Sequence, residues 1–522
     1  MSINASQLAR STIRQLIELG VSDFVLSPGS RNAPLSIALH EAAKKEIIEL
    51  HVRIDERGAA YYALGISKAS NTYVAVICTS GTAAANYHPA ALEAYHSNTS
   101  LLFITADRPA RLRRTGANQT TLQDGILSPL ITIDTAEIVD CKKLLRGGPV
   151  HLNLQFDEPL LEIDPEARWL DGLEIATVES QAEPRGELRP MPRSVMVIGH
   201  DMGGFDRTRI QKMVADLAIP VIAEDPLSFS TAVPHAALIL ADASLRESLK
   251  ADQVIVIGRT TLSRSVNAYV AQSNNVVVID SRIEKIDTSR EATNVLLHLP
   301  EYIETNADIS WINLWKSLGS QASNAIELDW SEQLVAREIS RAMPDYSALF
   351  VGSSRPVRDI EAFAQPRSGI HVYANRGLAG IDGNISTAFG ISTRFERTYS
   401  IIGDLTFLHD LSALANSLQS HHTIFIIDNN GGGIFSTLPQ AGVDGFEKIF
   451  GTPHGLNLES IIAGFGYSVE KVKTLSDLSR TFHHDGLHFV VVEVPNRDTN
   501  GDALRKIHQR VASAVRIGSN LA

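Results

Sequence analysis

The chain is 522 residues long, a length that predicts about two to four domains rather than one hydrophobic core. Its hydrophobic fraction of 44% and charged fraction of 20% are typical of globular proteins and exclude extensive disorder. The formal net charge of −12 argues against a nucleic-acid or anionic-membrane binder. Any anionic ligand must therefore be bound by local basic side chains.

The cysteine content and the N-terminal sequence predict a cytoplasmic protein. Cys78 and Cys141 are the two cysteines, and a pair within apolar stretches makes no disulfide framework, which fits a reducing compartment. The stretch M-S-I-N-A-S-Q-L-A-R-S-T-I-R carries charges where a signal peptide needs an apolar core. No apolar run approaches the roughly 20 residues of a membrane-spanning helix, so membrane insertion is not expected.

The first third of the chain alternates between strand-like and helix-like patterns. Short apolar blocks predict buried strands at 23–27, 73–79, 101–105 and 151–156. Ala-rich segments between them predict helices at 57–70 and 82–96. Continuous apolar strands separated by helices indicate a parallel sheet that is covered on both faces.

Two further α/β units follow a polar, Pro-containing linker within 164–192. Strands of the middle unit are expected at 195–199, 220–224, 254–258 and 276–280. Strands of the last unit are expected at 348–352, 399–402, 423–428 and 488–494. The predicted fold is therefore α/β with three doubly wound parallel-sheet domains, in which ligands bind at the carboxyl ends of the strands. The middle unit has G-H-D-M-G-G rather than G-x-G-x-x-G, so a dinucleotide site there is not expected.

The most specific motif lies in the last unit, where polar residues directly follow two successive strands. One strand ends in G-D-L, with Asp404 in the middle, and the next ends in D-N-N-G-G-G, where Asn429 follows Asp404 by 25 positions. Both side chains should emerge at the same edge of the sheet. Carboxylate, carboxamide and carbonyl oxygens suit Mg²⁺, and a glycine-rich turn admits phosphates. The alternative is a pair of ordinary Asx turns.

The pattern G-D-x…N-N-x-G at this spacing resembles the diphosphate-binding motif of thiamine-diphosphate enzymes, with Leu405 where the family usually has glycine. The resemblance implies thiamine diphosphate as cofactor, with Mg²⁺ or Mn²⁺ held by Asp404, Asn429 and the backbone oxygen of Gly431. It also implies a pyrimidine-binding domain at 1–175, a middle domain at 185–330 and a diphosphate-binding domain at 333–522.

Enzymes of this family use a glutamate to activate the cofactor, and R-I-D-E-R-G at 53–58 offers Glu56. The resemblance implies that Glu56 hydrogen-bonds the aminopyrimidine ring and so promotes formation of the reactive ylid. The alternative is simple charge complementarity at a helix N-terminus. The resemblance also implies that Ile381 supports the bent cofactor. Further cofactor contacts would come from Gly432, Ile434 and Phe435, although core packing is the alternative role for the apolar side chains.

Several other stretches resemble one branch of the family, the thiamine-diphosphate transferases of menaquinone biosynthesis. These stretches are S-P-G-S-R-N-A-P (27–34), T-S-G-T-A-A-A-N (79–86), T-A-D-R-P (105–109), G-A-N-Q (116–119), G-S-S-R-P-V-R (352–358) and A-N-R-G-L-A-G-I-D-G (374–383). That branch decarboxylates 2-oxoglutarate and adds the succinyl unit to isochorismate. The two substrates carry several carboxylates, so the resemblance implies an arginine-rich site.

The resemblance assigns roles to several polar residues of these stretches. Ser30, Arg31, Arg108 and Arg376 would bind isochorismate, and Gln119 would lie near the reacting carbon as a catalytic residue. Ser354 and Arg358 would bind the distal carboxylate of the succinyl unit. The middle domain would add a basic residue, either Lys285 or Arg282.

Two other functions remain open at this stage. Another thiamine-diphosphate carboligase or 2-oxoacid decarboxylase would keep Glu56, Asp404 and Asn429 without needing the arginines. A non-catalytic binding homologue would need no activating glutamate. The resemblance further implies a homodimer or homotetramer with its sites at the subunit interface.

Overall fold

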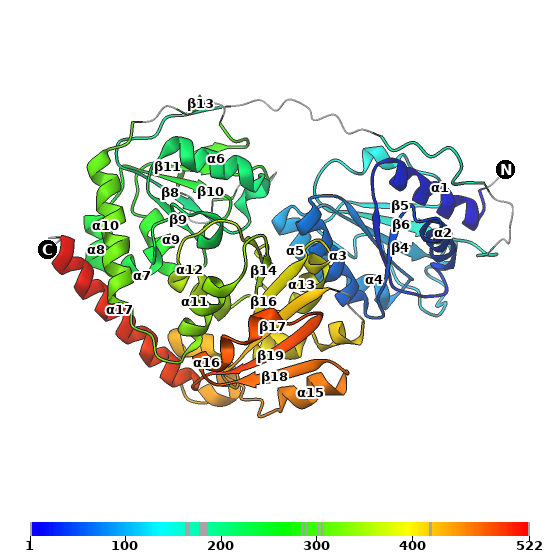
Figure 1. Ribbon diagram of the computed structural model, residues 1–522. Coiled ribbons are helices and arrows are strands. Elements are labelled where there is room, and N and C mark those ends of the chain that lie inside the picture. The colour runs from blue at the N-terminus through cyan, green and yellow to red at the C-terminus, as the bar shows by residue number, and fades with distance from the viewer. Residues whose placement is uncertain are drawn as a thin grey trace. The chain divides into compact units, whose positions relative to one another are not determined.

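The structure is a computed structural model in which helices cover three larger parallel sheets within the described residues (Figure 1). Contacts divide the chain into two compact units. The first comprises Met1–Gln181, Asn375–Arg394 and His409–Leu418, and the second Ala182–Ala374, Phe395–Leu408 and Gln419–Ala522. The structure describes residues 3–161, 168–176, 186–282, 286–287, 291–300, 302–303, 306–416 and 420–519.

The first unit is built on a six-stranded parallel sheet with the order β2-β1-β3-β4-β6-β5. Its strands are β1 (Asp23–Leu26), β2 (Glu49–Val52), β3 (Val74–Cys78), β4 (Leu101–Asp107), β5 (Thr132–Thr135) and β6 (Val150–Gln155). The four predicted strands are confirmed, and β1, β3 and β4 are buried at every position. The sequence missed β2 and β5, because neither is fully buried and neither carries a continuous apolar block.

The first unit contains both long and short helices. They are α1 (Ala5–Glu18), α2 (Ala33–Lys44), α3 (Glu56–Ser70), α4 (Thr82–Asn86), α5 (His88–Ser97) and α13 (Asn384–Ser392), with 3₁₀ turns at Ala110–Leu112, Cys141–Lys143 and Leu411–Ala415. The helical segment predicted at 82–96 is confirmed, although the chain forms two helices there that meet at Tyr87. Pro89 lies in the first turn of α5, where its missing N–H costs no helical hydrogen bond.

Helices α3 and α13 pack closely because each presents a glycine to the other. A Cβ atom on Gly65 would lie 2.0 Å from the backbone oxygen of Thr387. A Cβ atom on Gly390 would lie 2.1 Å from the backbone oxygen of Tyr62. Both distances are far below van der Waals contact, so the crossing requires glycine at both positions. This crossing brings the segment that begins at Asn375 into the unit that contains Glu56.

The second unit contains the other two larger sheets. The middle sheet has the order β12-β11-β10-β8-β9. Its strands are β8 (Ser194–Ile198), β9 (Val221–Ala223), β10 (Gln253–Ile257), β11 (Val276–Ile279) and β12 (Ala292–Leu296), and a separate parallel pair joins β7 (Glu187–Leu188) to β13 (Tyr302–Ile303). Its helices are α6 (Arg207–Leu217), α7 (Ala236–Ile239), α8 (Ala243–Ser248), α9 (Arg264–Val270) and α10 (Ile309–Ala325), with 3₁₀ turns at Met202–Gly204 and Pro226–Ser228.

The last sheet has six parallel strands in the order β15-β14-β16-β17-β19-β18. They are β14 (Ala348–Val351), β15 (His371–Tyr373), β16 (Arg397–Gly403), β17 (His421–Asp428), β18 (Ser468–Val472) and β19 (Leu487–Glu493). Its helices are α11 (Glu332–Ala342), α12 (Arg355–Phe363), α14 (Asp404–His409), α15 (Leu458–Gly464), α16 (Leu475–Leu478) and α17 (Arg497–Ser519), with short helical turns at Gly433–Thr437, Glu447–Gly451 and Thr481–His483. The strands predicted for both sheets are confirmed.

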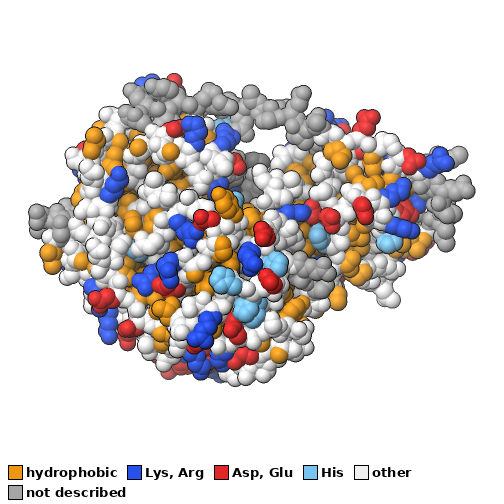
Figure 2. Space-filling model, in the orientation of Figure 1, with side chains coloured by type: hydrophobic (Ala, Val, Ile, Leu, Met, Phe, Trp, Pro, Cys, Tyr) orange, Lys and Arg blue, Asp and Glu red, His pale blue; other side chains and the backbone are white. Residues whose placement is uncertain are grey.

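Acidic and basic side chains are intermixed on the face of the molecule that Figure 2 shows. This distribution agrees with the expectation that anions are bound by local side chains rather than by a broad basic surface.

None of the helices in the described part of the chain has the length and apolarity that a membrane crossing requires.

Replacing Gly65 with alanine should destabilise the first unit. The added Cβ would overlap the Thr387 carbonyl, and overpacking of this kind costs about 1–3 kcal/mol. A lower midpoint of thermal unfolding, followed by circular dichroism, would check this. Gly464→Ala is the matched control, because a Cβ atom on this helical glycine meets nothing within 4 Å. Equal midpoints for the two variants would contradict the close-packing interpretation.

Candidate functional site

Two adjacent strands of the last sheet bring the predicted metal ligands to one edge. β16 pairs with β17 in parallel, and Gly403, the last residue of β16, lies opposite Ile427, the last residue but one of β17. Asp404, the first residue of α14, and Asn429, the first residue after β17, therefore lie at this carboxyl edge, with exposed fractions of 2% and 9%. The backbone N–H of Gly431 donates to Oδ2 of Asp404 over 2.8 Å, which joins the turn after β17 directly to the start of α14.

The side chain of Asn429 has an oxygen suited to a cation. Its Nδ2 donates to Oε1 of Glu332, so the amide nitrogen is occupied. Its Oδ1 is buried and has no hydrogen-bond partner among the described residues. Buried carboxamide oxygens normally accept a hydrogen bond or ligate a cation. A divalent cation beside Asp404 therefore fits the donor set.

The glycines after Asn429 allow the turn to pass very close to another backbone segment. Gly431 has φ of +136°, and a Cβ atom there would lie 2.1 Å from the oxygen of Gly451. A Cβ atom on Gly432 would lie 2.2 Å from the oxygen of Phe450. Side chains are therefore excluded at both positions, which are buried, and a turn without side chains lets backbone groups come close to phosphates. The carbonyl of Gly431 accepts from the N–H of Gly433 over 3.0 Å and retains a second lone pair.

His454 joins this site, although the sequence analysis missed it. Its Nε2 lies 3.3 Å from Oδ2 of Asp404 and 3.7 Å from Oδ1 of Asp428. The hydrogen bond with Asp404 raises the pKa of His454. Burial, together with the charge of Asp404, raises the pKa of Asp428. No local pattern around T-P-H-G-L indicates such a role, because the histidine is brought in from 50 positions away.

The predicted apolar contacts Ile434 and Phe435 lie on the short turn after the glycines. Both are half-buried rather than core residues. The ring of Phe435 lies 5.4 Å from the ring of Phe450, centroid to centroid. These side chains present a supported apolar surface beside the glycine turn.

Ser354 and Arg358 lie at the start of α12, at the carboxyl end of β14. Ser354 is the N-cap residue with φ of +75°, but its side chain does not cap the helix. Nη1 of Arg358 donates to the backbone oxygen of Ser354 over 2.5 Å. Both residues are half-buried, so a hydroxyl and a guanidinium lie together at a partly open strand end.

Glu56 is the first residue of α3 in the first unit. The helix is capped by Asp55, whose Oδ1 accepts from the N–H of Arg57 over 3.0 Å. Nδ2 of Asn86 donates to Oε2 of Glu56 over 3.2 Å. Asn86 is thus a second residue that the sequence analysis did not assign, although it ends the T-S-G-T-A-A-A-N stretch. The glutamate is half-buried and held at both its backbone and its carboxylate.

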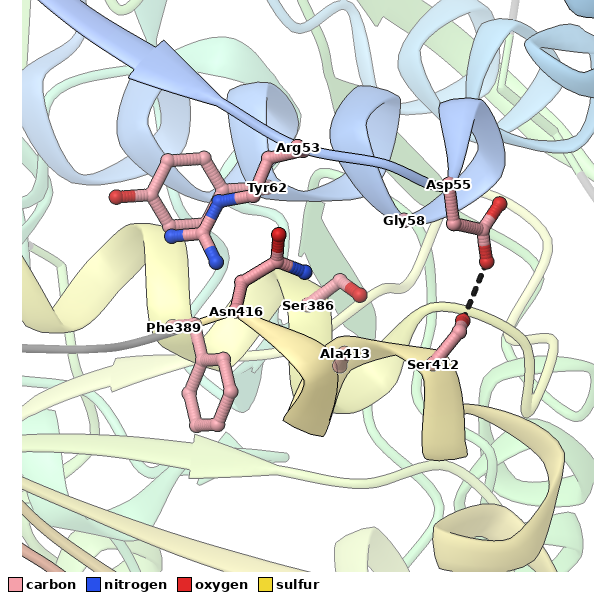
Figure 3. A pocket seen from close by; sticks show the side chains of 9 residues that line it. All are labelled: Arg53, Asp55, Gly58, Tyr62, Ser386, Phe389, Ser412, Ala413 and Asn416. Carbon is pink, nitrogen blue, oxygen red and sulfur yellow. Dashed lines mark hydrogen bonds between the residues drawn. The ribbon is translucent and has the colours of Figure 1, made fainter. Parts of the chain in front are cut away.

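A small pocket beside the first turn of α3 explains how the helix start is held (Figure 3). Oδ2 of Asp55 accepts from the hydroxyl of Ser412, and the guanidinium of Arg53 lies 3.8 Å from the ring centre of Tyr62. The pocket is lined by Arg53, Asp55, Gly58, Tyr62, Ser386, Phe389, Ser412, Ala413 and Asn416. Its contacts fix the turn from which Glu56 projects.

The loop S-P-G-S-R-N-A-P follows β1 and touches the loop that follows β3. A Cβ atom on Gly29 would lie 2.4 Å from Cβ of Thr79, so glycine permits this approach. The backbone N–H of Arg31 donates to Oγ1 of Thr79 over 3.3 Å. Nη1 of Arg31 donates to the oxygen of Phe156, while its buried Nε has no partner in the described part of the chain. Ser30 is exposed beside it.

Arg108 and Gln119 lie at the same edge of the first sheet. Nη1 of Arg108 donates to Oγ of Ser80 over 2.9 Å and to the backbone oxygen of Gln119 over 2.8 Å. Burial and the nearby charge of Arg31 lower the pKa of Arg108. Gln119 has φ of +57° and an exposed side chain. The structure thus brings together Arg31, Arg108 and Gln119, which the sequence places up to 88 positions apart.

The segment with Arg376 and Ile381 belongs to the first unit. The carboxylate of Glu93, which is 2% exposed, accepts from the backbone N–H groups of Gly377 and Leu378 over 2.8 and 2.7 Å. Arg376 is buried and Ile381 half-buried.

Of the two middle-domain candidates, the structure describes Arg282 alone. Lys285 lies outside the described residues. Arg282 is 5% exposed and is paired with Asp201 and Asp280 at the edge of the middle sheet. Burial opposes its charge, but the two carboxylates raise the pKa of Arg282.

Comparisons with known families cover nearly the whole chain. Residues 6–127 match the N-terminal TPP binding domain of thiamine pyrophosphate enzymes. Residues 168–351 match the middle domain of thiamine pyrophosphate enzymes. Residues 354–494 match the C-terminal TPP binding domain of these enzymes. Thiamine diphosphate is therefore the cofactor, as the sequence motifs predicted.

Individual relatives show to which branch of the thiamine-diphosphate enzymes this chain is similar. A 2-succinyl-5-enolpyruvyl-6-hydroxy-3-cyclohexene-1-carboxylate synthase from Thermobifida fusca is 35% identical, over 98% of this chain and 100% of the relative. Proteins of the same name from Nocardioides sp. and Saccharopolyspora erythraea are 36% and 34% identical, each over 97% of this chain. They are matched over 97% and 98% of their own lengths. The chain belongs to the 2-succinyl-5-enolpyruvyl-6-hydroxy-3-cyclohexene-1-carboxylate synthase family of thiamine-diphosphate enzymes.

Proposed function

We propose that this chain decarboxylates 2-oxoglutarate and adds the resulting succinyl unit to isochorismate in a 1,4-addition. The products would be 2-succinyl-5-enolpyruvyl-6-hydroxy-3-cyclohexene-1-carboxylate and carbon dioxide. The observation that carries the proposal is the basic edge of the first sheet, where Arg108 donates to the backbone oxygen of Gln119, and where burial and the charge of Arg31 lower the pKa of Arg108. An acidic chain needs such local cations to hold a substrate with several carboxylates.

The residues of the second unit would hold the charged end of the cofactor. Asp404, Asn429 and the carbonyl of Gly431 would ligate Mg²⁺ or Mn²⁺, and the unpartnered Oδ1 of Asn429 supports this. Backbone groups of the glycine turn, Gly432 among them, would approach the diphosphate. Ile434 and Phe435 would contact the apolar part of the cofactor. Thiamine diphosphate, once bound, supplies the electron sink that decarboxylation needs.

The residues of the first unit would hold the aminopyrimidine ring and isochorismate. Glu56 would hydrogen-bond the ring, and Asn86 would keep its carboxylate in place. Ile381 would support the bent cofactor. Ser30, Arg31, Arg108 and Arg376 would hold the carboxylates of isochorismate, with Gln119 near the reacting carbon.

Ser354 and Arg358 would hold the distal carboxylate of 2-oxoglutarate. Their support is that the Ser354 side chain does not cap α12, while the Arg358 guanidinium donates to the backbone oxygen of Ser354. A charge-assisted contact there selects a dicarboxylate over pyruvate. Lys285 would supply a further basic contact from the middle domain.

Assembly and location complete the proposal. Two or four copies of the chain would combine, so that the Glu56 half of one copy serves the Asp404 half of another. The domain boundaries would be near 175–185 and 330–333, and the protein would act in the cytoplasm.

The function is tested by incubating the protein with thiamine diphosphate, Mg²⁺, 2-oxoglutarate and isochorismate. Equal molar loss of both substrates and release of carbon dioxide are expected, with an adduct that keeps the enolpyruvyl group, as read by mass spectrometry. Pyruvate should not replace 2-oxoglutarate. Cofactor binding with turnover of pyruvate instead would indicate another carboligase or decarboxylase of the same superfamily.

Glu56→Gln should lower kcat by about 10²–10⁴-fold, because the amide cannot take part in the proton transfers of the carboxylate. Thiamine diphosphate should still bind, as measured by quenching of intrinsic fluorescence. Glu49→Gln, on the exposed edge of β2, is the control and should retain wild-type kcat. Full activity of Glu56→Gln would eliminate the proton-transfer role.

Arg31→Ala and Arg358→Ala should affect different substrates. Arg31→Ala should raise KM for isochorismate about tenfold or more and leave KM for 2-oxoglutarate nearly unchanged, and Arg358→Ala should do the opposite. Each charge-assisted contact contributes about 1.5–3 kcal/mol. Arg209→Ala, an exposed change on α6, is the control. If both variants altered the two KM values equally, the separate carboxylate sites would be refuted.

A further inference from the structure

A buried ionic network lies beside Asn429. Glu332, the first residue of α11, accepts from Nδ2 of Asn429 through Oε1. Its other oxygen, Oε2, lies 3.4 Å from Nε of Arg355, and Arg355 also pairs with Asp359 one turn later on α12. Glu332 is 4% exposed and Asp359 is 2% exposed. Together with Gly403, the last residue of β16, these side chains line one small cavity.

Stability alone does not account for this network. Buried ions lose their hydration, and packed apolar side chains are often at least as stabilising as a buried ion pair. Two carboxylates here share one guanidinium, and burial raises the pKa of Asp359 to about 7 despite the neighbouring Arg355. Since its net contribution to stability is small, we explain this buried polar network by the side chains that it holds in one orientation.

The network determines which end of the Asn429 amide faces Glu332. Both oxygens of Glu332 face donors, Oε1 the Nδ2 of Asn429 and Oε2 the Nε of Arg355, so the nitrogen of the carboxamide points to Glu332. The oxygen is then left at the opposite end, where it has no partner among the described residues. A reversed amide would set its oxygen against the carboxylate.

The surrounding backbone leaves this pair little freedom. A Cβ atom on Gly433 would lie 2.4 Å from Nδ2 of Asn429 and 3.4 Å from Oε1 of Glu332. The glycine turn therefore packs directly against the amide. The backbone N–H of Glu332 donates to Oδ1 of Asn500 over 3.1 Å, which anchors the start of α11.

We propose that Glu332 is a positioning residue that holds the carboxamide of Asn429 with its oxygen presented to the divalent cation. Arg355 keeps Glu332 in place by occupying its second oxygen. The inference rests on the metal site of the proposed function, and it assigns a role to a residue 97 positions from Asn429 in the sequence.

The test is a Mn²⁺ titration, followed by electron paramagnetic resonance of the free ion, with saturating thiamine diphosphate and no substrate. Glu332→Gln should weaken Mn²⁺ binding about 10–100-fold. The amide introduced by this change would turn its oxygen to Arg355 and its nitrogen to Asn429, which would reverse the Asn429 carboxamide. Glu338→Gln is the matched control on the same helix, because Glu338 is also buried and paired, with Arg337 and Arg341. It should bind Mn²⁺ within twofold of the wild type.

A compensating change separates positioning from a purely structural role. Asn429→Asp alone would set two carboxylates against each other and should also weaken Mn²⁺ binding. Combined with Glu332→Gln, it should restore affinity to within about fivefold of the wild type, because the glutamine nitrogen can donate to one aspartate oxygen and leave the other for the metal. Glu332→Asp, which keeps the charge but shortens the reach, should weaken binding and serves if Glu332→Gln does not fold.

The possible results of this test separate failure of the positioning role from failure of the proposed function. Wild-type Mn²⁺ affinity in both Glu332 variants, or a double variant no better than the single ones, would overturn the positioning role. Absence of Mn²⁺ binding by the wild type would overturn the metal site and the role together. The expected affinities in a protein that forms a different product would support the role and reject only the substrate assignment.

Discussion

The parallel pairing of β16 with β17 is the constraint on which the candidate metal site depends. The register sets Gly403 opposite Ile427, so that Asp404 follows β16 at the level where β17 ends at Asp428, and Asn429 is the next residue. Asp404 and Asn429 gain their proximity from this register and from the hydrogen bond between Gly431 and Asp404. A shift of one residue would send one side chain to the opposite face of the sheet. The ladder of backbone hydrogen bonds therefore supplies the precision that a metal site needs.

Burial gives the polar groups of both units their chemical character. At the edge of the last sheet, the buried carboxylate of Asp404 and the Asn429 amide oxygen, which has no partner among the described residues, make up the candidate cation site. At the edge of the first sheet, Arg31 and Arg108 lie close enough for the pKa of Arg108 to fall. The overall charge is −12, but fields beyond roughly 8 Å are screened at physiological salt. Local pairs of arginines can therefore bind anions in an acidic protein.

Close backbone packing supports these side chains in both units. Glycines admit the crossing of α3 with α13 and the approach of the 429–433 turn to Gly451. Glu56 depends on the helix crossing, since it begins α3. Asn429 depends on the approach of the glycine turn to Gly451. Rigid surroundings of this kind keep binding groups in one geometry before a ligand arrives, which reduces the entropy lost on binding.

The sequence by itself determined the elements whose signals are local. Continuous apolar runs predicted β1, β3, β16 and β17, because strands buried on both faces need apolar residues at every position. The positions of Asp404, Asn429 and Glu56 in the fold were predictable, because each directly follows a strand-like segment or begins a helix within a recognisable motif. By contrast, the sequence did not predict β2 and β5, because part-buried strands carry no such run. It also did not predict the break at Tyr87, because the flanking sequence is Ala-rich.

The tertiary structure alone decided which distant side chains meet. Glu332 reaches Asn429 across 97 positions, and His454 reaches Asp404 across 50. Arg282, a basic residue that the motifs left open as a substrate ligand, is instead paired with carboxylates at the edge of the middle sheet. The physical reason is that apolar periodicity and turn chemistry act between near neighbours, whereas the partner of a buried polar group depends on how complete helices and strands pack.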